Sequence, residues 1–297
     1  MKVLNLGSLN IDKTYTVEHF VQEGQTINAI SYSSSCGGKG LNQSVALAKA
    51  GMKVYHAGMI GQDGGILKRR LEEGGVCTEY LAVAQVESGH ALIQLDAQGR
   101  NCIICYGGAN HAVTPEYIDT VLSGFAAGDY LLLQNEITNV AYAIQRAAQK
   151  GMRVIFNPSP ITPDLKEYPL RSVSCFLVNE VEGEALTGEK EHEAILAALH
   201  RAYPGATIVL TVGSRGVLCQ QGERVYRHGA YPVHAVDTTA AGDTFCGYFV
   251  AGLAQGQALE QVLQCASAAS AISVSRAGAS DSIPGTEEVE TFLRLHG

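Results

Sequence analysis

The sequence predicts an α/β fold with a mainly parallel central sheet flanked by helices, and two observations support this. Short apolar segments typical of buried strands alternate with segments of helical periodicity from about residue 130 onward. Such a rhythm builds βαβ units, which set parallel strands side by side and helices over both faces. Polar residues also follow several of these strands, where open α/β sheets bind their ligands. The strands are expected at 130–134, 153–156, 175–178 and 207–212, with helices at 140–150 and from about 181.

The other segments are expected to belong to the same single domain, which spans residues 1–297. Strand-like stretches at about 13–33 and 89–106 interrupt the βαβ rhythm, and we assign them to a small appended β-sheet. The second stretch is expected to form a hairpin of 91–95 with 101–106. Further strands are expected at 3–7 and 52–57, and helices at 41–50, 64–73, 245–253, 258–275 and 287–295, with another starting at 114–116.

Composition and charge limit the class of protein. Hydrophobic residues make up 46% and charged residues 17% of the 297 residues, which is typical of a compact globular protein. The net charge of −8 argues against nucleic acid and anionic membranes as partners, so an anionic ligand needs local groups. The sequence shows no signal-peptide pattern and no apolar stretch of membrane-spanning length. The eight cysteines are expected to be reduced core residues of a cytoplasmic protein, with Cys102 and Cys105 on opposite faces of a strand.

The stretch 235–247 predicts a phosphoryl-transfer site. Alternating Val233 and Val236 indicate a strand, which runs into a turn of small residues at 239–242 and then an apolar helix. The first N–H groups of a helix have no intrahelical partners and favour a phosphate. A carboxylate there repels phosphate, but it is suited to taking a proton from an attacking hydroxyl. Asp243 is therefore a candidate base, and the alternative is that it only caps the helix.

Polar residues near the N-terminus are candidates for binding an acceptor with several hydroxyls. Asn10 and Asp12 follow the first strand at alternate positions and share one side of an extended chain, although Asn and Asp also serve as turn residues. The glycine-rich segment 37–40 precedes a helix that carries Asn42. It is not a Walker loop, because Lys39 is followed by glycine, and a plain turn is its alternative interpretation.

Later polar residues follow predicted strands in the same way. Glu136 comes just after the strand at 130–134, where it could orient a metal-bound water or simply be an exposed loop carboxylate. Asn179 and Glu182 lie three apart at a helix start and share a face, and helix capping explains Asn179 nearly as well. The turn at 211–216 suits a nucleotide phosphate or no ligand at all. Each signal is weak alone, and their order along the chain is what is specific.

Taken in order, these segments resemble the ribokinase/pfkB family of sugar kinases. The matching motifs lie at 7–12, 37–43, 179–182, 211–216 and 236–245 and span nearly the whole chain. The resemblance implies a ribokinase-like three-layer α/β fold with a small β-sheet lid. It also implies a carbohydrate kinase that transfers the γ-phosphate of ATP to a primary hydroxyl of a sugar. Mg²⁺, an activating K⁺ ion and a homodimer formed through the lid come with the same resemblance.

The resemblance also gives roles to individual residues. Asp243 would be the catalytic base, and amides around Ala240, Ala241 and Gly242 would form the anion hole for the transferring phosphoryl group. The sugar would be bound by Asn10, Asp12, Gly38, Lys39, Asn42, Ala91, Ile93 and Glu136. ATP and its Mg²⁺ would be bound by Asn179, Glu182, Thr211, Gly213, Ser214, Gly216 and Gly242, with Ser267 beside the adenine. A K⁺ ion would lie among Asp237, Thr239, Ser273, Arg276, Gly278 and Ser282.

Several positions depart from the family's pattern and leave the acceptor open. His90 and Gln94 occupy lid positions where apolar residues are usual, and Cys36 precedes the glycine pair. Cys246 stands where Asn is common, and Ser267 where His or Asn is often found. Ribose is the expected acceptor. Another pentose, a deoxypentose, a hexose or a nucleoside is the alternative on the same fold, and a non-catalytic sugar-binding protein is the alternative of another class.

Overall fold

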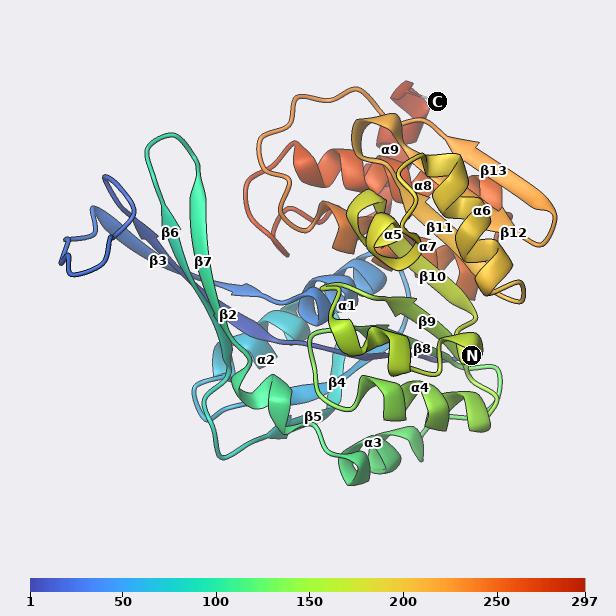
Figure 1. Ribbon diagram of the computed structural model, residues 1–297, viewed down its shortest axis with the longest axis horizontal. Helices are drawn as coiled ribbons and strands as arrows, with labels where there is room; N and C mark the ends of the chain where they lie inside the picture. The colour runs from blue at the N-terminus through green and yellow to red at the C-terminus, as the bar shows by residue number, and fades with distance from the viewer. Residues whose placement is uncertain (297) are drawn as a thin grey trace.

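A nine-stranded sheet forms the centre of the computed structural model, which describes residues 1–296 (Figure 1). Its strands are β1 (Val3–Leu6), β4 (Val54–Ile60), β5 (Cys77–Val83), β8 (Tyr130–Gln134), β9 (Arg153–Asn157), β10 (Cys175–Asn179), β11 (Thr207–Thr211), β12 (Val217–Gln221) and β13 (Arg224–His228). They lie in the order β13-β12-β11-β10-β9-β8-β1-β4-β5. Every neighbouring pair is parallel except β11–β12 and β12–β13. The predicted mainly parallel sheet is confirmed.

Helices cover both faces of this sheet, so the predicted three-layer arrangement is also confirmed. Alternate residues of β8 show why, because Leu131 and Leu133 pack into one apolar cluster while Tyr130 and Leu132 pack into the other. The first cluster includes side chains of α3 (Pro115–Leu122), α4 (Val140–Gln149) and α6 (His192–Ala202), with α5 (Glu180–Thr187) beside it. The second includes side chains of α1 (Lys39–Lys49), α2 (Gly65–Glu73), α7 (Ala241–Ala254), α8 (Leu259–Val274) and α9 (Thr286–His296).

A second, four-stranded sheet projects from this body (Figure 1). It contains β2 (Asn10–Thr16), β3 (Ser31–Gly37), β6 (Gly89–Leu95) and β7 (Asn101–Tyr106), in the order β3-β2-β6-β7. We call these four strands the lid. The stretch predicted at 89–106 forms its hairpin, whereas most of the stretch predicted at 13–33 is the connection between β2 and β3. Because β2 starts four residues after β1 ends, the root of the lid lies against the ends of the central strands.

Two sequence-based expectations are wrong. The alternation of Val233 and Val236 forms no strand, since the chain between β13 and α7 has no strand beside it to pair with. The eight cysteines are free thiols, but Cys102 and Cys105 are exposed on β7, an edge strand of the lid. Alternating apolar character alone therefore overestimates burial at the edge of a small sheet. No helix within residues 1–296 has both the length and the apolar character needed to cross a bilayer.

Candidate active site

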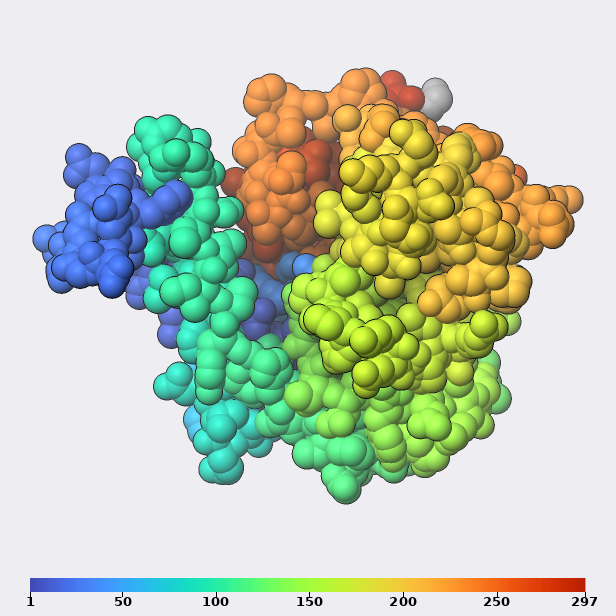
Figure 2. Space-filling view, viewed as in Figure 1, coloured from blue at the N-terminus to red at the C-terminus, as the bar shows by residue number. Residues whose placement is uncertain are grey.

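A polar cavity lies where β9, β10 and β11 end and α7 begins, at the carboxyl edge of the sheet. Its volume is about 180 Å³. Figure 2 shows the surface hollowed between the lid strands, in teal, and the C-terminal part of the chain, in orange. Predicted residues from four separate segments line this cavity: Lys39, Asn179, Glu182, Thr211, Ala240, Ala241, Gly242 and Asp243. The fold therefore gathers residues from both the predicted acceptor set and the predicted nucleotide set.

Asp243 lies in the first turn of α7 with both carboxylate oxygens held. The side-chain amide of Asn42 donates to Oδ2 at 3.0 Å, and that of Gln43 donates to Oδ1 at 2.9 Å. Burial raises the pKa of Asp243, while Lys39 and these two donors limit the rise. The capping alternative is wrong, because the N-cap of α7 is Ala240 and no side chain caps it. A half-buried carboxylate restrained in this way is suited to accepting a proton.

Backbone amides beside Asp243 are open to an anion. The N–H of Ala241 bonds weakly to the carbonyl of Thr238, at 3.3 Å. Within the described residues, the N–H groups of Gly242 and Asp243 have no backbone partner. A Cβ added at Gly242 would meet open space, so nothing in the protein occupies the volume in front of this turn. Free donors of the kind expected at a helix start are therefore present at Gly242 and Asp243, and within residues 1–296 the N–H of Ala240 likewise has no backbone partner.

The predicted acceptor residues meet beneath the lid. Glu136 accepts a hydrogen bond from the Lys39 N–H at 3.1 Å and lies 3.6 Å from its ammonium nitrogen. The hydroxyl of Ser8 donates to the same carboxylate. Burial, with Glu136 nearby, raises the pKa of Asp12 to about 6. Gly38 has φ +93°, which lets the chain turn into α1 against the backbone of Asn10.

The lid adds its own predicted residues through strand register. Ala91 is opposite Asp12 and Ile93 opposite Thr14 in the parallel β2–β6 pair, so both lie on the face that carries Asp12. Asn10 is held by Asn110, whose amide donates to it at 2.8 Å. Sequence reasoning missed Asn110, which is buried and follows the lid hairpin without any motif of its own. Asn110 therefore joins the acceptor set as the residue that orients Asn10.

At the nucleotide end, Asn179 and Glu182 form a capping box at the start of α5. The capping interpretation is correct, and it does not remove either residue from the cavity that both line. Thr211, at the end of β11, lines the same cavity. Four other predicted nucleotide residues do not line it. Gly213, Ser214 and Gly216 lie in the turn after β11, and Ser267 is buried within α8.

The predicted cation residues form two hydrogen-bonded groups. Asp237 accepts from the N–H groups of Thr239 at 2.9 Å and Gly278 at 3.0 Å. Although burial opposes it, these bonds lower the pKa of Asp237. The hydroxyls of Ser273 and Ser282 are 2.7 Å apart. The two loops are further joined by main-chain bonds from residues 236 and 237 to the carbonyl of residue 274.

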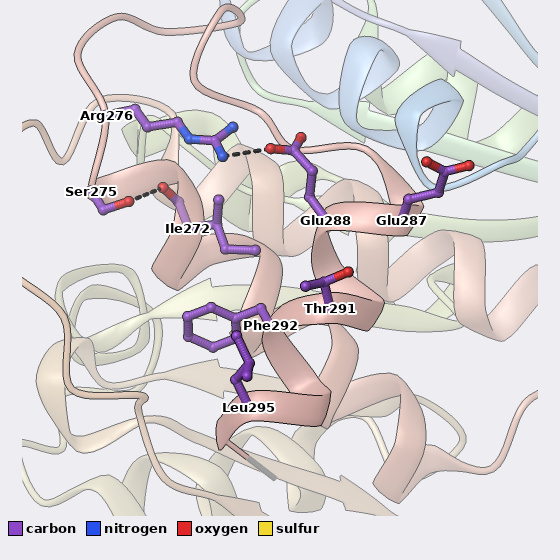
Figure 3. A pocket seen from close by; sticks show the side chains of 8 residues that line it. All are labelled: Ile272, Ser275, Arg276, Glu287, Glu288, Thr291, Phe292 and Leu295. Carbon is purple, nitrogen blue, oxygen red and sulfur yellow. Dashed lines mark hydrogen bonds and ion pairs between the residues drawn. The ribbon is translucent and has the colours of Figure 1, made fainter.

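Arg276 uses its side chain elsewhere. Its guanidinium pairs with Glu288 of α9 at 2.6 Å (Figure 3). A cavity of about 520 Å³ lies beside this pair, between the end of α8 and α9. It is lined by the apolar Ile272, Phe292 and Leu295 and by the polar or charged Ser275, Arg276, Glu287, Glu288 and Thr291. Of the predicted site residues, this cavity includes Arg276 alone. Arg276 can therefore serve a cation only through its main-chain carbonyl.

Comparison with known proteins decides the family. The model of the pfkB family of carbohydrate kinases matches residues 1–286. The chain belongs to this family. The predicted class of enzyme, an ATP-dependent sugar kinase, is thereby confirmed.

Individual relatives match over their whole length. A ribokinase of Haemophilus influenzae is 35% identical, covering 97% of each chain. A deoxyribokinase of Salmonella typhi is 32% identical over the full length of both. The solved structure of Arabidopsis thaliana ribokinase complexed with ribose and ATP superposes with a TM-score of 0.89 at 30% identity, covering 99% of this chain and 98% of that one. The sugar kinase is thus similar to enzymes named for two different pentoses.

Proposed function

We propose that this sugar kinase transfers the γ-phosphoryl group of ATP to the terminal hydroxyl of ribose. One observation supports this most strongly. The carboxylate of Asp243 lies between free N–H groups at the start of α7 and the amide of Asn42 in the predicted acceptor set. A base beside an anion hole is the arrangement that phosphoryl transfer to an alcohol requires.

The chain's own residues account for each movement of charge. The sugar oxygen forms a bond to the γ-phosphorus while the bond between that phosphorus and the β–γ bridging oxygen breaks, which leaves ADP. Asp243 accepts the proton of the attacking hydroxyl, and the N–H groups of Gly242 and Asp243 donate to the oxygens of the transferring group. Lys39, which lines the same cavity, adds positive charge next to those oxygens. Catalysis in this scheme is positioning and charge stabilisation.

The residues present fit Mg²⁺ that arrives with ATP. Residues 1–296 contain no group of three or more His, Cys, Asp or Glu side chains arranged to hold a metal alone. Mg²⁺ in kinases is usually held by one or two carboxylates together with phosphate oxygens and water. Glu182, buried and lining the cavity, is the carboxylate placed for this, with Asn179 beside it. When bound, Mg²⁺ would neutralise charge on the phosphates.

Ribose is proposed as the acceptor because of the relatives and because the acceptor set is rich in hydroxyl partners. The Oδ1 atom of Asn42 is buried and has no partner within residues 1–296, so it is ready to accept from a sugar hydroxyl. Deoxyribose is the second candidate, since one full-length relative is named deoxyribokinase. The free thiols suit a reducing compartment, and we keep the cytoplasm as the proposed location.

A substrate panel tests the proposed acceptor. ADP formation is measured with purified protein, ATP and Mg²⁺ against ribose, deoxyribose, other pentoses, hexoses and nucleosides. We expect the highest kcat/KM with ribose. Higher kcat/KM with deoxyribose would keep the chemistry and change the acceptor, whereas turnover of nucleosides alone would overturn a free sugar as substrate. No ADP with any acceptor would favour a sugar-binding protein without catalysis.

Activation by K⁺ is proposed at the Asp237 loop. Each carboxylate oxygen of Asp237 accepts one N–H and keeps a lone pair for a cation. A cation there would fix the turn that leads into the anion hole, so replacing K⁺ with Na⁺ should lower kcat. Asp237→Asn should reduce this response while leaving the sugar KM nearly unchanged. Equal rates of the wild type in K⁺ and in Na⁺ would contradict the site.

A homodimer through the lid is proposed from its outward face. Ile104, Tyr106 and Tyr32 lie on the face opposite Asp12 and are 63%, 50% and 55% exposed. These side chains lie on the two edge strands of one sheet face, and exposed apolar side chains on a shared face indicate a protein interface. Ile104→Asp is expected to shift the sedimentation coefficient from dimer to monomer, whereas Leu295→Asp, an exposed position on α9, should leave it unchanged. A wild type that sediments as a monomer would rule out this assembly.

A further inference from the structure

Buried amide side chains continue from Asp243 into the protein. Gln43 on α1, Gln134 on β8 and Asn5 on β1 are fully buried and hydrogen-bonded in series. The Nε2 atom of Gln134 donates to Oε1 of Gln43 at 2.7 Å and to Oδ1 of Asn5 at 2.9 Å. Gln43 then donates from its own Nε2 to Asp243. We call Asn5, Gln134 and Gln43 the amide relay.

Main-chain carbonyls set the direction of the amide relay at both ends. The amide nitrogen of Asn5 donates to the carbonyl of Gly40 at 2.8 Å, and a carbonyl can only accept. This turns the Asn5 oxygen toward Gln134, so Gln134 must present its nitrogen. At the other end, the carbonyl of Leu177 accepts from Asn157 at 2.9 Å. The Asn157 oxygen therefore faces Gln43 and accepts from it at 3.2 Å.

With both neighbours oriented, the amide of Gln43 has one allowed orientation. Its oxygen must accept from Gln134, and its two N–H groups must point at Asn157 and Asp243. The reverse orientation would set the Gln43 oxygen against two acceptors, Asn157 Oδ1 and Asp243 Oδ1, and the Gln43 nitrogen against the donating nitrogen of Gln134. Gln43 is thus held as a donor to the Asp243 carboxylate. A donor favours the ionised form of a carboxyl group.

Packing alone does not explain the glutamine at 134. Its Oε1 atom is buried without a partner within residues 1–296, which costs stability. A Cβ added at Gly7 would come within 2.1 Å of this oxygen, so the glycine directly after β1 leaves space for the amide. A methionine would fill the same volume without burying an unpaired oxygen. The amide is therefore retained at a cost that its two N–H donations offset.

We propose that Gln43 is a positioning residue that keeps Asp243 ionised and oriented, and that Gln134 and Asn5 fix its donor direction. The inference rests on Asp243 being the base of the proposed function. It goes further, because it assigns a role to residues that contact neither substrate and that lie on the buried side of the carboxylate.

The dependence of kcat on pH tests this inference. Gln43→Met removes the donor at similar volume, so the acid limb of the kcat profile should move up by about one pH unit or more, a tenfold change in the protonation equilibrium. Gln134→Glu does not touch Asp243, yet its carboxyl cannot make both donations of the amide. When ionised it can only accept, which turns the Gln43 amide around, and when protonated it has a single O–H for Asn5 and Gln43 together. The limb should therefore move in the same direction. The KM values for sugar and ATP should change much less than kcat.

Ser44→Ala is the matched control. Ser44 is fully buried and accepts from Asn5 at 2.8 Å, but Gly40 still fixes the direction of that amide. This variant should lower the unfolding temperature and leave the acid limb in place. If the acid limb of the kcat profile stays in place in a folded Gln43→Met or Gln134→Glu variant, the amide relay is overturned. The two substitutions lie on separate elements, so the test can still be made if one variant does not fold. If Asp243→Asn also keeps its turnover, the proposed function fails; if it is inactive, only the relay fails.

Discussion

Replacing Asp243 with asparagine is expected to lower kcat by about 10²- to 10⁴-fold, the usual contribution of a general base. Asparagine keeps the shape of the side chain but cannot accept the proton of the sugar hydroxyl. The free N–H groups at the start of α7 are unaffected, so ATP should still bind. A coupled assay of ADP formation gives kcat, and titration calorimetry gives the affinity for ATP.

Asp119→Asn is the control for this change. Asp119 lies on α3, where it pairs with Arg146 and Tyr142 on the surface, away from the cavity. It should keep the wild-type kcat and lose no more than about 1 kcal/mol of stability, the usual range for an exposed ion pair. Near-normal kcat for Asp243→Asn would remove Asp243 from the mechanism, whereas loss of ATP binding would indicate a disturbed helix start.

Replacing Asp12 with asparagine is expected to raise the sugar KM by roughly 10- to 100-fold, since a hydrogen bond to a charged acceptor contributes about 1.5–3 kcal/mol. The pKa of Asp12 is raised to about 6 by burial and by Glu136. The carboxylate is the form that accepts hydroxyls, so protonation weakens sugar binding. The wild-type sugar KM should therefore rise as pH falls below about 6, and Asp12→Asn should lack this rise.

Steady-state kinetics between pH 5 and 8 with saturating ATP measures both effects. Ser35→Ala is a useful control, because Ser35 pairs with Asp12 across β2 and β3 and carries no charge. It should leave the pH dependence of the sugar KM intact. If Asp12→Asn keeps both the wild-type sugar KM and its pH dependence, Asp12 does not bind the sugar. The rise of the sugar KM at low pH then belongs to another group.

The central sheet was predictable because its parallel strands are apolar on both faces and are separated by helices of clear period. The antiparallel β12 and β13 were missed, since they follow a glycine turn instead of a helix. Val233 and Val236 show the opposite error. The two valines are β-branched and favour a strand locally, but they are three residues apart and so would not share one face. A strand also needs a partner, and none lies beside that segment.

Site residues were predictable where a motif or a strand end marks them, as at Asp243, Asn179 and Lys39. Gln43 lies within a predicted motif and Gln134 at the end of a predicted strand, but their roles, like that of Asn110, depend on side-chain amide directions that are set by residues far apart in sequence. Gln134 is indistinguishable in the sequence from the polar end of any strand. Such roles depend on which amide faces which carbonyl, and only the three-dimensional structure contains that information.

A crystal structure with ribose and a non-hydrolysable ATP analogue tests the central claim most directly. The account predicts the terminal hydroxyl of the sugar within about 2.6–3.2 Å of a carboxylate oxygen of Asp243. It also predicts the γ-phosphate at the N–H groups of Gly242 and Asp243, on the far side of that hydroxyl. A sugar bound with its terminal hydroxyl away from Asp243, or a γ-phosphate away from the start of α7, would contradict it.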